Sequence, residues 1–256
     1  NKLGIARSSD FDTVSITPGT EFMKKLDINI NYAFTNPNKY GVNKLIVSCS
    51  DEPGEGEHKL YKYIRDYPDE HKKFTTVIYG LDADLIMLTL NHLDVAESMY
   101  LYRETPHFIK SLDKSLNPNC SYLMDIPKFA TALAYDLNDN RKPETKQKLN
   151  RIFDYILLCF FMGNDFLPHF PALNIRTTGI DRIMDAYKSV IGTTNENLTN
   201  GDTIRWNNLR KVIMKLADTE DKLMIEEYQI REKQARNTKS RSGKLDEKFT
   251  SIPMID

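Results

Sequence analysis

Twice along this chain, a short apolar run leads into a pair of acidic residues and then into a segment with helical periodicity. The first run (44–49) precedes two glutamates, and the second (74–79) precedes two aspartates. Short runs rich in β-branched and apolar residues predict buried strands. Functional groups of parallel α/β sheets gather beyond the carboxyl ends of the strands. The repetition therefore predicts an α/β fold that brings both acidic pairs to one edge of its sheet.

The first acidic pair, Glu55 and Glu57, is set between glycines in the segment 53–59 (PGEGEHK). Glycine admits backbone angles that other residues avoid, so this loop can bring both carboxylates close to a small, hard cation. The alternative is that the glutamates lie at the start of a helix over about residues 55–67, where the macrodipole favours acids.

The second pair, Asp82 and Asp84, is separated by one small residue, Ala83. In extended backbone, residues two apart point to the same side, so both carboxylates can face one ligand. As an alternative, aspartates at a strand-to-helix junction serve as turn and N-cap residues. Two consecutive junctions with paired acids favour a metal site.

A fifth acid follows the most apolar predicted helix, residues 147–162. Gly163 can end that helix in the left-handed conformation, and Asp165 comes two residues later. As a structural residue, Asp165 would cap the following turn. As a ligand, it would complete the set Glu55, Glu57, Asp82, Asp84 and Asp165.

Five carboxylates around one spot raise each other's pKa and require cations. Mg²⁺ or Mn²⁺ suits oxygen ligands, whereas zinc is disfavoured because no cysteine and histidine set has ligand spacing. Two ions about 3.5–4 Å apart stabilise both the attacking and the leaving oxygen of a phosphoryl displacement. The predicted chemistry is that of a nuclease.

Several further elements are predicted from periodicity. A helix is expected to start with Thr17 as N-cap and Pro18 in its first turn, and its free N–H groups can bind a phosphate. A simple capped core helix is the alternative. The other expected elements are a strand at 98–103 and helices at 125–137, 178–190 and from Trp206 toward Arg231, followed by a basic, flexible tail.

Composition limits the environment and the partners. Thirty-five basic and 36 acidic residues give a net charge of −1, so any contact with phosphate must be local. Three widely spaced cysteines favour reduced thiols and a cytoplasmic or nuclear location. The sequence has no apolar run of about 20 residues, so we expect no membrane span.

Four segments in order, 16–23, 53–59, 79–88 and 160–169, resemble the hallmark blocks of the XRN-type 5'-to-3' exoribonucleases. The resemblance implies a PIN/FEN-like α/β nuclease fold, with a mostly parallel central sheet flanked by helices and an α-rich carboxy-terminal part. It also implies RNA degradation: metal-dependent hydrolysis of single-stranded RNA with a 5' monophosphate to nucleoside monophosphates. The five acids match metal-binding acids of the family. His58, Lys59, Thr17 and Gly19 are the expected substrate-binding residues.

The family's amino-terminal segment, which supplies a first strand, further aspartates and a phosphate-binding basic helix, has no counterpart before Ser9. We therefore expect part of a catalytic core that needs this segment as a partner and has little activity alone. The expected organisation is a nuclease core at 1–175, a helical extension at 176–236 and a polar tail at 237–256. Alternatives are a FEN-type structure-specific DNA nuclease and a non-catalytic RNA-binding or scaffold relative.

Overall fold

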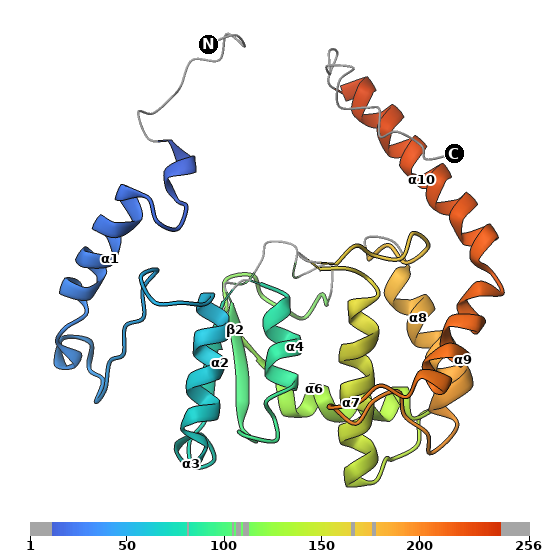
Figure 1. Ribbon diagram of the computed structural model, residues 1–256, viewed down its shortest axis with the longest axis horizontal. Helices are drawn as coiled ribbons and strands as arrows, with labels where there is room; N and C mark the ends of the chain where they lie inside the picture. Colours follow the sequence, from blue (N-terminus) through green and yellow to red (C-terminus); the bar gives the residue numbers. More distant parts are fainter. Residues whose placement is uncertain are drawn as a thin grey trace. The chain divides into compact units, whose positions relative to one another are not determined.

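A computed structural model describes residues 12–241, apart from residues 81, 104, 106–108, 110–112, 165–166 and 176–177. The chain divides into two compact units, one made of residues 1–76 with 94–98 and the other of residues 77–93 with 99–256. Figure 1 shows the helices and strands of each.

The described elements of the first unit are mainly helical. They are η1 (Thr13–Ser15), α1 (Glu21–Ala33), η2 (Pro37–Tyr40), α2 (Gly56–Asp66) and α3 (Pro68–His71). Helix α2 confirms the predicted helix after the glutamate loop, with Tyr61 and Ile64 buried.

Helix α1 begins later than predicted. Its N-cap is Thr20, whose hydroxyl accepts the Met23 N–H at 3.3 Å, and not Thr17. The Thr17 hydroxyl instead donates to the Val14 carbonyl at 2.7 Å. Gly19 has a φ of +87°, so the backbone turns between Thr17 and the helix and moves the start of α1 to Glu21.

The strand predicted for residues 44–49 is wrong. This segment is described, and its residues alternate in exposure from Leu45 to Cys49, but none of them belongs to a strand. A strand requires a hydrogen-bonded neighbour, and no described segment pairs with this one. The β-branched and apolar composition of this run therefore did not suffice to predict a strand.

The sheet has three strands in the order β1 (Thr76–Tyr79), β2 (Met99–Arg103) and β3 (Tyr122–Asp125). Bonds from Thr76 N to Ser98 O and from Gly80 N to Tyr102 O advance in the same direction, so β1 and β2 are parallel. Strands β2 and β3 are antiparallel. The α/β class is confirmed, but the sheet is small and mixed, not mostly parallel. Strand β3 was not predicted, because its four residues include no β-branched side chain.

Helices dominate the second unit. They are α4 (Asp84–Leu90), α6 (Ile126–Leu137), α7 (Thr145–Phe160), α8 (Gly179–Tyr187), the π-helical turn η3 (Lys188–Gly192), α9 (Trp206–Ala217) and α10 (Glu220–Arg241). Helix α6 starts as predicted, since the Asp125 carboxylate accepts the Lys128 N–H at 3.0 Å.

The core of this unit lies among α6, α7, α8 and α9, which Figure 1 shows on the right. Leu137, Leu158, Tyr187 and Leu209 belong to one buried cluster, with one residue from each helix. Complete burial of such a side chain contributes about 1.5–3 kcal/mol. The predicted helices therefore build the core, although Trp206 at the start of α9 and Phe160 at the end of α7 are exposed.

The single long helix predicted from Trp206 is wrong. Helix α9 ends at Ala217, and α10 begins at Glu220. The basic segment after Arg231, predicted to be a flexible tail, is helical as far as Arg241. Ion pairs four residues apart, such as Glu232 with Arg236 at 2.8 Å, support a solvated helix of this kind. Among the described residues, no helix combines the length and apolar character that a membrane crossing requires.

Candidate metal centre

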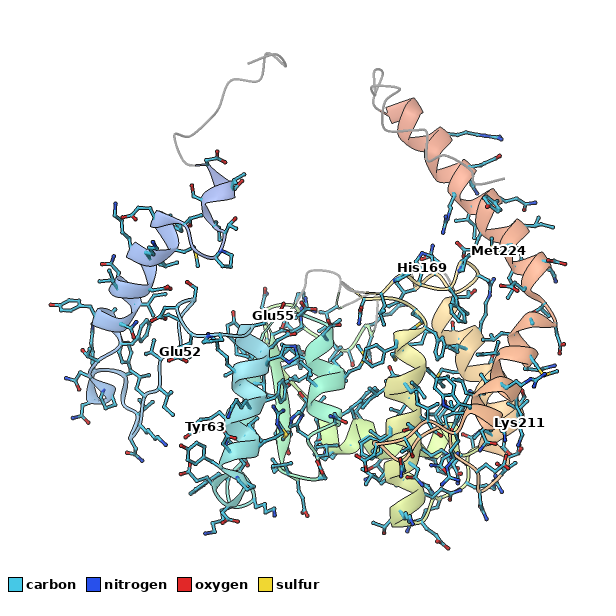
Figure 2. All side chains as sticks on the ribbon, in the orientation of Figure 1. Glu52, Glu55, Tyr63, His169, Lys211 and Met224 are labelled. Atoms are coloured by element: carbon cyan, nitrogen blue, oxygen red, sulfur yellow. The ribbon has the colours of Figure 1, made fainter. Side chains whose placement is uncertain are left out.

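The glutamate loop brings three possible metal ligands together. One ligand atom each from Glu55, Glu57 and His58 lies within 4.8 Å of the others. Glu55 is the N-cap of α2, as Figure 2 shows, and Glu57 lies in the first turn. The Nε2 of His58 is 3.9 Å from a Glu55 carboxylate oxygen. Carboxylate oxygens suit Mg²⁺ and Mn²⁺, so this donor set fits the predicted ions.

Glycine permits the loop conformation before this cluster. Gly54 has a φ of +100°, which residues with a Cβ rarely adopt, although an added Cβ would meet no atom closer than the Lys59 Cγ at 3.9 Å. The constraint at Gly54 is therefore backbone conformation and not lack of space. The glutamates occupy a helix start, as the alternative interpretation predicts, and their carboxylates also lie close together.

Two contacts fix the segment before the loop. The Ser50 hydroxyl donates to the Asp27 carboxylate at 2.6 Å, and the Lys59 ammonium donates to the Cys49 carbonyl at 2.6 Å. Lys59, predicted to bind substrate, thus has a backbone acceptor. Desolvation and the neighbouring Asp27 raise the pKa of the Cys49 thiol, so it stays protonated near neutral pH and is a poor metal ligand.

The aspartate pair lies where β1 leads into α4, in the second unit. Asp84 is the first residue of α4, and an Asp82 carboxylate oxygen accepts its N–H at 3.3 Å. This bond is the turn contact that the alternative interpretation predicts. It uses one oxygen of Asp82, and a carboxylate offers about four lone-pair sites. Asp82 is exposed, so its remaining sites are accessible.

Asp165 lies outside the described residues, but the turn around it is described. Gly163 has the predicted left-handed conformation, with a φ of +80°, but α7 ends earlier than predicted, at Phe160. An added Cβ at Gly163 would lie 2.8 Å from the His169 nitrogen. The Asn164 N–H donates to the Leu167 carbonyl at 2.9 Å, and the Leu167 N–H donates to the Asn164 side chain at 2.8 Å. His169, also labelled in Figure 2, is exposed.

Among the predicted substrate-binding residues, Thr17 and Gly19 form the turn before α1 and not the helix start. His58 was predicted to contact substrate, and the structure places it with the glutamates as a third ligand candidate. Its spacing three residues after Glu55 is the sequence signal for that proximity.

A glycine-flanked carboxylate pair with a histidine, and an aspartate pair beyond a parallel strand, define an α/β protein with acidic sites suited to divalent metal ions. Two family models match the chain. The XRN 5'-3' exonuclease N-terminus matches residues 2–105, and the Xrn1 helical domain matches residues 146–253. The chain belongs to the XRN family of 5'-3' exonucleases.

Curated relatives agree with this assignment. The chain is 30% identical to 5'-3' exoribonuclease 2 of Eremothecium gossypii over 98% of its own length and 31% of the relative's. It is 29% identical to 5'-3' exoribonuclease 2 of Arabidopsis thaliana, over 89% and 26% of the two lengths. For 5'-3' exoribonuclease 1 of Schizosaccharomyces pombe, identity is 33% over 83% and 17%. The chain thus spans less than a third of the length of these relatives.

Proposed function

We propose that this chain is part of the catalytic core of a 5'-to-3' exoribonuclease with a PIN/FEN-like fold. Its substrate is single-stranded RNA with a 5' monophosphate, and its products are nucleoside monophosphates. The observation that carries the proposal is the convergence of Glu55, Glu57 and His58 inside the segment that matches the exonuclease amino terminus. The three unpaired cysteine thiols support a reducing cytoplasmic or nuclear setting.

The proposed metal ligands are Glu55, Glu57, Asp82, Asp84 and Asp165. A bound pair of Mg²⁺ or Mn²⁺ ions would supply hydroxide from coordinated water and neutralise charge on the leaving oxygen. His58 would add an imidazole nitrogen or hold a proton beside Glu55, from which it is 3.9 Å away. Lys59 would act by fixing the loop through Cys49.

We also propose that residues 1–175 form the nuclease part, 176–236 a helical extension and 237–256 a polar tail. Helices α8, α9 and α10 support the helical character of the extension. An amino-terminal family segment is the proposed protein partner, and the unpaired segment 44–49 supports a role for an added strand.

The first test measures Mg²⁺- and Mn²⁺-dependent hydrolysis of 5'-monophosphorylated RNA, with and without a family amino-terminal segment supplied in trans. We expect activity only with the segment, and its loss in Asp82→Ala. Asp69→Ala removes an exposed acid from α3 and should leave activity unchanged. Strong processive degradation by the chain alone would contradict the expectation of a partial core.

Metal binding provides an independent measurement. Glu55→Gln should weaken Mn²⁺ binding in calorimetry by about tenfold, because removal of a charged oxygen ligand costs at least about 1.4 kcal/mol. Glu70→Gln, at an exposed acid outside the cluster, should bind normally.

Two results would favour the alternatives. Equal or faster hydrolysis of matched DNA would favour the FEN-type nuclease. RNA binding without hydrolysis, unchanged when Asp82 and Asp84 are both alanine, would favour a non-catalytic relative.

A further inference from the structure

A polar cavity lies at the amino-terminal end of α7, in the second unit. Its volume is about 650 Å³, within the range of small-molecule sites. Its walls come from the α6–α7 connection, the first turns of α7, residues 195–197 and Arg205. The proposed metal ligand Asp165 follows the opposite end of this helix. Sixteen helical residues span about 24 Å, so the cavity is distinct from that end.

Four cations line the cavity: Arg141, Lys142, Lys146 and Arg205. In the part of the chain that the structure describes, none of them forms an ion pair. Arg141 is oriented by backbone acceptors, since its guanidinium donates to the Gly192 carbonyl at 3.0 Å and to the Asn138 carbonyl at 3.3 Å. Four positively charged side chains thus line one cavity, and hydrogen bonds to backbone carbonyls orient one of them, Arg141.

Two carboxylates share these walls, and one is already compensated. Glu196 accepts from the Lys211 ammonium at 2.5 Å, which leaves Glu144 as the lining acid without an ion pair among the described residues. Four cations face one uncompensated carboxylate, so the cavity carries net positive charge although the whole chain has a charge of −1. Such local charge attracts anions.

The neutral lining is rich in side-chain amides. Gln147 donates to the Asn195 side chain at 3.3 Å, and Asn150 also faces the cavity. The described lining residues include no aromatic side chain. A side-chain amide can hydrogen-bond to both donors and acceptors, and the edge of a base and a ribose carry such groups. The described lining offers hydrogen bonds to a nucleoside but no aromatic ring to stack on its base.

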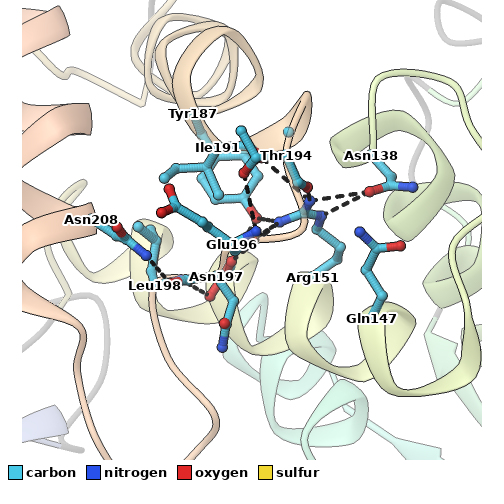
Figure 3. Close-up of polar contacts among 12 residues, drawn as sticks. Asn138, Gln147, Arg151, Tyr187, Ile191, Thr194, Glu196, Asn197, Leu198 and Asn208 are labelled. Atoms are coloured by element: carbon cyan, nitrogen blue, oxygen red, sulfur yellow. Dashed lines mark hydrogen bonds and ion pairs between the residues drawn. The ribbon is translucent and has the colours of Figure 1, made fainter.

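A buried arginine connects segments that carry part of the cavity lining (Figure 3). Arg151 is fully buried and donates to the Thr194 carbonyl at 2.6 Å, the Glu196 carbonyl at 2.7 Å and the Asn138 side chain at 3.1 Å. These bonds tie the segment before Asn197 to the end of α6. A site fixed before its ligand arrives loses less conformational entropy on binding.

We propose that this cavity binds a nucleoside phosphate, whose phosphates contact Lys142, Lys146 and Arg205 and whose base or ribose contacts the amides. The site shares no residue with the proposed metal centre, and binding there does not depend on the proposed exoribonuclease activity. The volume of about 650 Å³ is in the range of small-molecule sites, so we assign a single nucleotide as the ligand.

The test is calorimetric titration of the whole chain with ADP in excess EDTA, which removes metal-dependent binding at the acidic site. The double variant Lys142→Gln with Lys146→Gln should weaken ADP binding by about tenfold or more, because two charge-assisted hydrogen bonds are lost. Lys148→Gln is the matched control, since Lys148 lies on the same helix but outside the cavity and contacts Thr131 at 2.9 Å. Its affinity should stay within about twofold of wild type.

Pyrophosphate serves as the second probe. We expect it to bind more weakly than ADP, because it lacks the groups that contact the amides. Pyrophosphate binding as tight as that of ADP would overturn the assignment to a nucleoside phosphate. Absence of saturable ADP binding up to about 1 mM, or equal ADP affinity in the double variant, would overturn the site itself. If circular dichroism shows that the double variant is unfolded, the single variant Arg205→Gln is titrated in its place. An ADP affinity equal to that of wild type would then overturn the site.

Discussion

Replacing Arg151 by methionine tests whether the buried network of the second unit stabilises the fold. The guanidinium makes six hydrogen bonds to five acceptor atoms, which belong to Asn138, Tyr187, Ile191, Thr194 and Glu196. It also lies 3.9 Å from the Asp154 carboxylate, and both side chains are fully buried. Methionine is of similar length and apolar, so it removes the donors and the charge together.

The expected loss is large. Each buried acceptor left without a donor costs about 1–3 kcal/mol. Five independent losses would sum to at least about 5 kcal/mol, but neighbouring groups are not additive and water can enter. Removing one partner of a buried ion pair costs about 3–5 kcal/mol. We therefore expect Arg151→Met to lower the free energy of unfolding by at least about 3 kcal/mol, a large part of the total for a small domain.

Urea unfolding followed by far-UV circular dichroism measures this loss. Arg210→Met is the control, because Arg210 is an exposed residue on α9 and its replacement should change stability by no more than about 0.5 kcal/mol. Arg151→Lys keeps the charge but not the planar fork and should fall between the two. A loss below about 1 kcal/mol in Arg151→Met, with an unchanged urea dependence, would refute the reasoning.

Three other predictions use different contacts. Burial raises the pKa of Asp154 from 3.8 to about 6, against donors from Tyr187, Thr199 and Leu198 and the charge of Arg151. Between these pH values the folded chain therefore binds more protons than the unfolded chain, and the free energy of unfolding should fall as pH rises from 3.8 to about 6. Urea unfolding of Asp154→Asn should lack this pH dependence. Gly163→Ala should cost at least about 1–2 kcal/mol in thermal unfolding, whereas Gly56→Ala, where an added Cβ meets nothing within 4 Å, should be nearly neutral. Lys59→Met should speed proteolysis of residues 48–54, since the bond to Cys49 is lost; an unchanged cleavage rate would argue against this anchor.

Local sequence determined much of the secondary structure. The start of α6 could be predicted because Asp125 caps it through the Lys128 N–H, and the left-handed conformation after α7 could be predicted because Gly163 tolerates a positive φ. The proximity of Glu55 and His58 is equally local, since residues three apart on a helix are neighbours. Such features depend on a few consecutive residues and are therefore readable without tertiary information.

Features that need distant partners could not be predicted. The apolar, β-branched run in residues 44–49 predicted a strand, but a strand also needs a hydrogen-bonded neighbour. The antiparallel pairing of β3 and the network around Arg151 depend on segments brought together by folding. Arg151 shows the physical reason most directly, because its hydrogen-bond acceptors lie 13 to 45 residues away in the sequence. Only the packing of α6, α7 and α8 buries this charged side chain and supplies acceptors for its N–H groups.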